Sequence, residues 1–226
     1  MTLTLSDRYR GSLLGLACGD AVGTSVEFML RGTFEPVTDM LGGGPFQLKA
    51  GQWTDDTSMA LCLAESLLCK RGFDPADQMT RYLNWWTSGY LSATGECFDI
   101  GLTVREALAA FQDHGDPFAQ GDYREKTRAQ ITGSGYCVAS LEAALWCVLT
   151  TDSFAAAVLA AANLGDDADT TAAIVGQLAG AHYGVQGIPV AWLEKLCMRE
   201  DIQDMADALF KVATEKAGSD QNLSRR

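Results

Sequence analysis

Two short acidic segments of the sequence carry residue types that bind hard metal cations. The first is Thr54-Asp55-Asp56 and the second is Asp167-Ala168-Asp169-Thr170. Each combines carboxylates with a threonine hydroxyl, and oxygen ligands of this kind suit Mg²⁺ and Mn²⁺. Asp167 and Asp169 are two residues apart across a predicted bend, a spacing that lets both reach one ion. Together the two segments could hold a pair of ions about 3.5–4 Å apart, with a water between them.

A simpler interpretation assigns both segments to the N-termini of helices. Thr54 precedes an apolar helical pattern, where a capping residue is preferred, and acids in a first turn interact favourably with the helix dipole. Capping needs only one side chain, however, whereas the second segment and the residue before it hold Asp166, Asp167 and Asp169. Trp53, beside the first segment, suggests a partly walled cleft. The metal-free interpretation stays open as an alternative.

Other metal sites fit the sequence less well. A calcium loop of the EF-hand type is excluded because its glycine and final glutamate are not at the required positions. Zinc is disfavoured because the chain has only His114 and His182, neither beside another expected ligand, and no paired cysteines.

Two further acidic residues, Glu27 and Asp99, carry no distinctive signal by themselves. Glu27 follows a glycine-rich helical pattern and would ordinarily be a solvated surface acid. Asp99 lies in Gly95-Glu96-Cys97-Phe98-Asp99-Ile100-Gly101 and could simply cap the next helix.

The elements that must position these residues are predicted to be helices. Strand-like alternation is almost absent, so the fold class is all-α. Thr24–Gly51 has no clear period and is expected to be a long loop, a kind of segment that is often functional. Helices are expected over Asp7–Ala21 (capped by Ser6 or Asp7), Asp55–Lys70, Pro75–Thr87, Ile100–Asp113, Ser134–Leu149, Ser153–Asn163, Ala168–Tyr183, Pro189–Cys197 and Ile202–Glu215.

The first of these helices carries a stripe of glycines at every fourth position. They are Gly11, Gly15, Gly19 and Gly23. Glycine is unfavourable inside a helix, so a stripe of it is best explained by close approach of another backbone. We therefore expect this helix to be central and tightly packed.

Composition sets the broad class of the protein. The chain has 226 residues, of which 47% are hydrophobic, enough for a sizeable core. Its net charge of −12 argues against binding to nucleic acid or to an anionic membrane. We predict one helical domain over residues 1–216 and a disordered tail over 217–226. Seven scattered cysteines without a C-x-x-C pair, and no signal-peptide pattern, indicate a cytoplasmic protein.

Four segments in this order resemble the ADP-ribosylglycohydrolase family, which includes dinitrogenase-reductase-activating glycohydrolases and ADP-ribosyl hydrolases. The segments are R-G-S-L-L-G-L-A-C-G-D-A-V-G-T-S-V-E (Arg10–Glu27), W-T-D-D-T-S-M-A (Trp53–Ala60), G-E-C-F-D-I-G (Gly95–Gly101) and N-L-G-D-D-A-D-T-T-A-A-I-V-G-Q-L-A-G-A (Asn163–Ala181). Each is modestly specific, but the ordered set is a strong indication of common descent.

The resemblance implies an all-α orthogonal bundle, in one domain, with two Mg²⁺ or Mn²⁺ ions. It implies a hydrolase that cleaves the ribosyl bond of an ADP-ribosylated protein side chain or of a related small molecule. Glu27 matches an acid that serves catalysis or gating, and Asp99 matches an acid that contacts the scissile ribose. Asp55 and Asp167 join them as expected catalytic residues. The implied metal ligands are Thr54, Asp55, Asp56, Asp167, Asp169 and Thr170.

The chain is shorter than the family pattern. The family's N-G-S-L-M-R segment, which helps to form the ligand cleft, has no counterpart here. The sequence instead passes from Gly115–Phe118 through a polar stretch, Ala119–Arg128, to Ile131–Tyr136. The family's F-D-I-G-N-T also ends in Leu102-Thr103 in this chain. The shortening motivates a second hypothesis, a catalytically silent metal-binding or structural protein, and a homodimer that covers exposed apolar surface.

Overall fold

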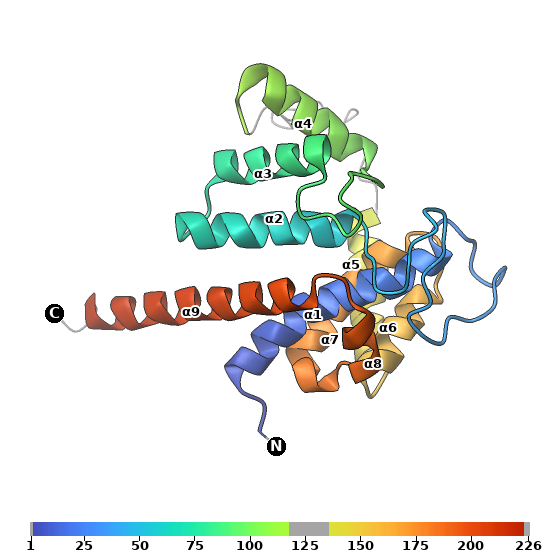
Figure 1. The fold of residues 1–226 in the computed structure, drawn as a ribbon. Helices are drawn as coiled ribbons and strands as arrows, with labels where there is room; N and C mark the ends of the chain where they lie inside the picture. The colour runs from blue at the N-terminus through green and yellow to red at the C-terminus, as the bar shows by residue number, and fades with distance from the viewer. Residues whose placement is uncertain (1, 118–135, 224–226) are drawn as a thin grey trace.

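The computed structural model describes residues 2–117 and 136–223, and within these ranges the fold is all-α, as predicted. Figure 1 shows the arrangement of the helices. The only β-pairing in the described ranges is an isolated bridge between Gly43 and Leu48. The elements are α1 (Leu5–Gly23), η1 (Thr24–Val26), α2 (Asp55–Lys70), α3 (Pro75–Ser88), α4 (Leu102–His114), α5 (Tyr136–Leu149), α6 (Phe154–Ala162), α7 (Ala168–Tyr183), η2 (Val185–Gly187), α8 (Val190–Lys195) and α9 (Arg199–Leu223).

The antiparallel pair α1 and α7 forms the centre of the fold, and its backbones nearly touch. A methyl group on Gly15 would lie 2.3 Å from the Gly176 carbonyl oxygen, and one on Gly19 would lie 2.0 Å from that of Ala172. The glycine stripe of α1 thus packs directly on α7, as the sequence predicted. The consequence for the site is topological: the C-terminus of α1 lies beside the N-terminus of α7.

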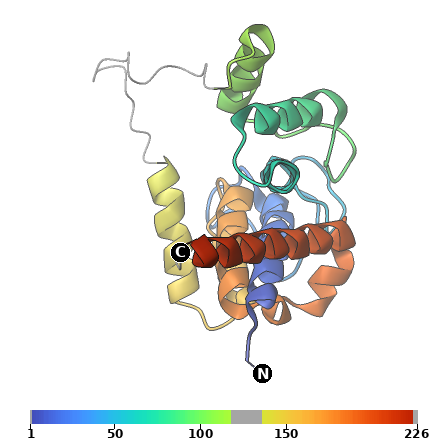
Figure 2. The same cartoon turned by 90° about the vertical axis from the view of Figure 1, so that its left-hand side faces the viewer.

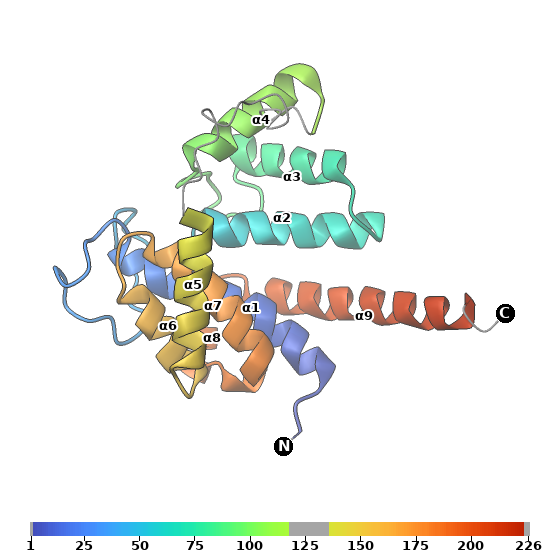
Figure 3. The same cartoon turned by 180° about the vertical axis from the view of Figure 1, so that it is seen from behind.

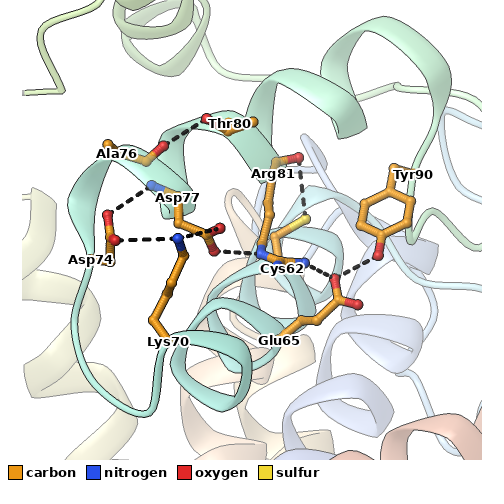
Figure 4. A network of polar contacts seen from close by, with 9 residues as sticks. All are labelled: Cys62, Glu65, Lys70, Asp74, Ala76, Asp77, Thr80, Arg81 and Tyr90. Carbon is orange, nitrogen blue, oxygen red and sulfur yellow. Dashed lines mark hydrogen bonds and ion pairs between the residues drawn. The ribbon is translucent and has the colours of Figure 1, made fainter.

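A second layer, α2 to α4, lies above this pair (Figure 1). Figure 4 shows the polar network that joins α2 to α3. Arg81 of α3 forms ion pairs with Glu65 of α2 and, over 2.7 Å, with Asp77. The Tyr90 hydroxyl donates a 2.6 Å hydrogen bond to Glu65. Tyr90 begins the loop that leads to Asp99, so the network ties that loop to α2.

The last helix, α9, crosses in front of α1 and then extends away from the rest of the fold (Figures 2 and 3). Arg10 pairs with Asp207 and Tyr9 packs edge-on against Phe210, which fixes α9 on α1. Within the described residues, no helix combines the length and apolar character needed to cross a membrane.

The helix ends differ from the sequence-based bounds at several places. The first helix begins at Leu5 rather than Asp7, and its cap is Thr4, whose hydroxyl accepts from the Asp7 backbone while Asp7 accepts from the Thr4 backbone. The last helix runs from Arg199 to Leu223, so residues 217–223 of the predicted tail belong to α9. The division of the chain at residue 216 stays a prediction. The expected loop Thr24–Gly51 is irregular after η1.

Trp53 was expected to wall a cleft, but it is fully buried in the core. Its indole nitrogen lies 3.4 Å from the Cys197 carbonyl oxygen. Trp53 is therefore a core residue, without the exposed surface that a cleft wall would need.

Candidate metal centre

The predicted site residues come from four segments that meet where α1, α2 and α7 end or begin. Glu27 follows η1, Asp55 and Asp56 lie in the first turn of α2, and Asp169 lies in the first turn of α7. Asp99 lies just before α4. Glu27 and Asp169 are both buried. The antiparallel α1–α7 pair is what brings the first and last of these segments together.

Asp20, which the sequence did not single out, is the fully buried centre of this meeting point. One carboxylate oxygen accepts from the Thr54 backbone and hydroxyl, both at 2.9 Å. The other accepts from the Thr57 backbone at 3.0 Å and hydroxyl at 2.6 Å. Asp20 of α1 thus caps the N-terminus of α2 from outside that helix. Burial raises its pKa, and the four donors oppose this shift.

The alternative of simple helix caps can be examined directly. Thr54 occupies the N-cap position of α2 and Asp167 that of α7, yet neither side chain makes a capping hydrogen bond. The Thr54 hydroxyl instead faces Asp20 and, at 3.3 Å, Asp169. Helix capping therefore does not account for these two side chains.

The carboxylates form two groups that share Asp169. In one group, oxygens of Glu27, Asp99 and Asp169 lie within 4.8 Å of one another; in the other, the same holds for Asp55, Asp56 and Asp169. A residue with two carboxylate oxygens between two such groups is suited to bridge a pair of cations. The arrangement matches the chemistry of Mg²⁺ or Mn²⁺, which prefer carboxylate and hydroxyl oxygens.

Three oxygens in these groups are buried without a hydrogen-bond donor among the described residues. They are Oε2 of Glu27, Oδ2 of Asp56 and Oδ1 of Asp169. Buried polar atoms are ordinarily hydrogen-bonded, and an isolated buried charge is very unfavourable. Unpaired acceptors gathered in one place are what a cation site requires, so the residues present fit a divalent metal.

The electrostatics lead to the same interpretation. Burial raises the pKa of Asp55 to about 9 and that of Asp169 to about 10, and neighbouring carboxylates add to both shifts. Burial likewise raises the pKa of Glu27 to about 8, of Asp56 to about 7 and of Asp99 to about 6. Without a counter-charge these groups cannot all ionise near neutral pH. A divalent cation would relieve that repulsion.

Three of the predicted ligands, Thr54, Asp167 and Thr170, lie outside the two groups. Asp167 is half-buried at the start of α7, close enough that its charge raises the pKa of Glu27 and Asp56. Thr170, also half-buried, hydrogen bonds to Asp56. Asp166, the third acid of the same segment, is exposed.

Comparison with known proteins decides the family. The model of the ADP-ribosylglycohydrolase family matches residues 1–126 and 114–218. The chain belongs to the ADP-ribosylglycohydrolase family. Its similarity to "ADP-ribosylarginine hydrolase Tri1" of Serratia proteamaculans (strain 568) is 36% identity, covering 93% of this chain and 81% of that protein. The protein of the same name from Pseudomonas putida (strain GB-1) is 37% identical over 92% of this chain and 79% of its own.

Two further comparisons extend the family relationship. The "ADP-ribosyl-[dinitrogen reductase] glycohydrolase" of Rhodospirillum rubrum is 29% identical, covering 93% of this chain and 98% of its own length. A solved structure titled "ADP-ribosylglycohydrolase-related protein complex" superimposes with a TM-score of 0.77 at 33% identity, covering 92% of this chain and 98% of that one. The family and its all-α fold agree with the prediction from the four motifs.

The comparisons also confirm that this chain is a shortened member of the family. The alignment with the Serratia protein spans 296 positions, 70 more than the 226 residues of this chain, so at least 70 positions have no residue here. The two ranges that match the family model overlap at 114–126, which places the gap near those residues. The polar stretch Ala119–Arg128, which was predicted to replace the missing segment, lies outside the described residues.

Proposed function

We propose that this chain is a Mg²⁺- or Mn²⁺-dependent hydrolase that releases ADP-ribose from a modified protein side chain, with arginine as the acceptor. The observation that carries the proposal is the pair of carboxylate groups joined by Asp169, with three buried oxygens that lack donors. Family membership supplies the reaction class. The arginine acceptor is supported by the two relatives whose names specify ADP-ribosylarginine.

In this proposal the carboxylates of Asp55, Asp56, Asp167 and Asp169 and the hydroxyls of Thr54 and Thr170 would hold the two ions. Divalent ions bound here would supply the positive charge that orients ribose hydroxyls and activates water. The chain itself does the positioning. Asp20 fixes the first turn of α2, and with it the direction of Asp55 and Asp56.

The remaining acids act on the substrate. Asp99, just before α4, contacts the ribose, and its carboxylate stabilises the positive charge that develops at the anomeric carbon in an oxocarbenium-like transition state. In the metal-free protein, burial and the charge of Asp99 raise the pKa of Glu27 to about 8. A carboxyl group that titrates in this range suits exchange of a proton with the leaving acceptor or with water. Asp55 and Asp167 contribute catalytically from within the ligand set.

The test is release of ADP-ribose from arginine- and serine-ADP-ribosylated proteins and from ADP-ribosyl small molecules, with Mn²⁺, Mg²⁺ or chelator. We expect metal-dependent release, fastest from the arginine substrate. Asp169→Asn and Asp55→Asn should each abolish it, and full activity in both variants would overturn the metal mechanism.

The shortened sequence favours a second candidate, a silent family member that binds metal without turnover. Its signature is a folded protein that binds Mn²⁺ but releases ADP-ribose from none of these substrates. For either candidate function, we also propose that the protein forms a homodimer and is located in the cytoplasm. The seven scattered cysteines, without a C-x-x-C pair, support a reducing compartment.

A further inference from the structure

The chain reverses direction at Glu27 in a turn that places a bulky residue in the left-handed region. The Met29 backbone donates a 3.1 Å hydrogen bond to the Val26 carbonyl oxygen. Glu27 has φ −55 and ψ 140, and Phe28 has φ +62. This is the pattern of a type II turn, in which the position held by Phe28 normally requires glycine or asparagine. The Phe28 side chain is 66% exposed, so packing of the ring does not compensate for the strain.

A second left-handed residue, Asp166, faces this turn. Its φ is +59. The Phe28 backbone donates to the Asp166 carbonyl oxygen at 2.8 Å, and the Asp166 backbone donates to the Met29 carbonyl oxygen at 2.7 Å. These two reciprocal hydrogen bonds, which we call the Phe28–Asp166 clasp, join the segment of Glu27 to the segment of Asp169.

The neighbouring residue Gly165 allows the two segments to approach this closely. Its φ is +72, and a methyl group on it would lie 2.5 Å from the Met29 carbonyl oxygen. The Asp166 side chain, by contrast, is exposed, and among the described residues it belongs to neither carboxylate group. The role of residues 165 and 166 therefore lies in their backbone.

We propose that the Phe28–Asp166 clasp is the device that positions Glu27 against Asp169. Glu27 directly precedes Phe28 in one of the two joined segments. Asp169 lies three residues after Asp166 in the other. Gly165 and Asp166 are thus positioning residues that act through backbone conformation. The clasp determines where Glu27 lies, whereas Asp55 and Asp56 of the other group are held by α2 and Asp20. This inference rests on the proposed function only in taking the bound ions to be Mg²⁺ or Mn²⁺.

The first test compares two substitutions that remove the same charge. Asp166→Asn keeps a residue that tolerates positive φ, whereas Asp166→Val introduces a β-branched residue that does not. Calorimetric titration of the full chain with Mn²⁺ should show two ions in the wild type and in Asp166→Asn. In Asp166→Val the ion beside Glu27, Asp99 and Asp169 should bind about 10- to 100-fold more weakly, the usual effect of disturbing a group that lies around a ligand without being one, while the other ion is retained. A general loss of structure would instead lower the affinity for both ions.

The second test measures the two hydrogen bonds of the clasp in the absence of metal, by amide hydrogen exchange. The Phe28 and Asp166 amides should be protected in the wild type and in Asp166→Asn, and should exchange faster in Asp166→Val and Gly165→Ala. Phe28→Asn, which suits the left-handed position, should keep both ions and the protection even if the valine variant fails to fold. Protected amides in a wild type that binds no Mn²⁺ would support the clasp and overturn the proposed function. Equal behaviour of the asparagine and valine variants, or loss of an ion in Phe28→Asn, would overturn the clasp.

Discussion

Asp20 is the residue on which the geometry of the metal centre depends most. It is fully buried, and its carboxylate accepts four hydrogen bonds from Thr54 and Thr57. Asp20→Asn would replace one acceptor oxygen by an amide nitrogen that faces donors. We expect a loss of at least about 2 kcal/mol in the free energy of unfolding, measured by urea denaturation in chelator.

The matched substitution Asp55→Asn removes a charge from the same cluster and should act in the opposite direction. Burial, together with the charge of Asp56, raises the pKa of Asp55 to about 9, so the metal-free protein must take up a proton at this carboxyl group when it folds near neutral pH. The amide of asparagine avoids this cost. Stability in chelator should rise or stay equal while activity is lost, as is common for functional sites. Destabilisation by Asp55→Asn equal to that by Asp20→Asn would show that the two carboxylates have the same structural role.

The raised pKa values predict how stability depends on pH. A carboxyl group whose pKa is higher in the folded state than in the unfolded state binds protons preferentially when folded. The stabilisation is complete below the unfolded value of about 4. It is lost as pH rises through the folded values of about 7 for Asp56, 8 for Glu27 and 9 for Asp55. The melting temperature in chelator should therefore fall between pH 5 and pH 9.

Mg²⁺ should reverse this trend, because metal binding needs ionised ligands and releases protons. The increase in melting temperature on adding Mg²⁺ should be larger at pH 8 than at pH 6. The Asp55→Asn variant should show a flatter dependence on pH in chelator. A melting temperature that rises with pH in the metal-free wild type would contradict the assignment.

Among the elements, the contact between α1 and α7 determines where the site residues lie. Gly19→Ala would place a methyl group 2.0 Å from the Ala172 carbonyl oxygen, which belongs to the backbone and cannot move aside. The gain in helix propensity is about 1 kcal/mol, and overpacking costs about 1–3 kcal/mol or more, so the variant should be less stable. Metal affinity should fall with it, because α1 and α7 separate at the end that carries Asp20 and Asp169.

Gly101→Ala provides the control for thermal unfolding, because nothing lies within 4 Å of a methyl group at that position. It should change the melting temperature much less than Gly19→Ala does. Equal changes would mean that close packing of α1 on α7 is not what the glycines provide.

The helices could be predicted from the sequence because their signals are local. Apolar periodicity located α2 and α7, and the glycine stripe indicated the close contact of α1. Asp20 had no such signal, because its partners Thr54 and Thr57 lie 34 and 37 residues away. The clasp was hidden for the same reason, since neither Phe28 nor Asp166 is a residue that normally marks a left-handed turn as strongly as glycine.

At the scale of the whole molecule, α5 carries exposed apolar surface. Leu145, Trp146 and Leu149 are all exposed on this helix. The gap in the alignment lies near residues 114–126, shortly before α5 begins at Tyr136. In the sequence, relatives therefore have additional residues shortly before the region of this helix. Exposed apolar surface of this kind is commonly covered by a second copy.

We therefore predict a homodimer in which α5 contributes to the interface. Light scattering coupled to size-exclusion chromatography should give the mass of two chains, and Trp146→Glu should give the mass of one. Phe73→Glu is the matched control, because Phe73 is another exposed aromatic side chain, located beyond the opposite end of α2 from the metal centre, and the variant should remain a dimer. A wild type that is monomeric at high concentration would contradict the prediction. If both substitutions gave monomers, the dissociation would be explained by charge repulsion and not by the α5 surface, because each adds a negative charge to a chain that already carries −12.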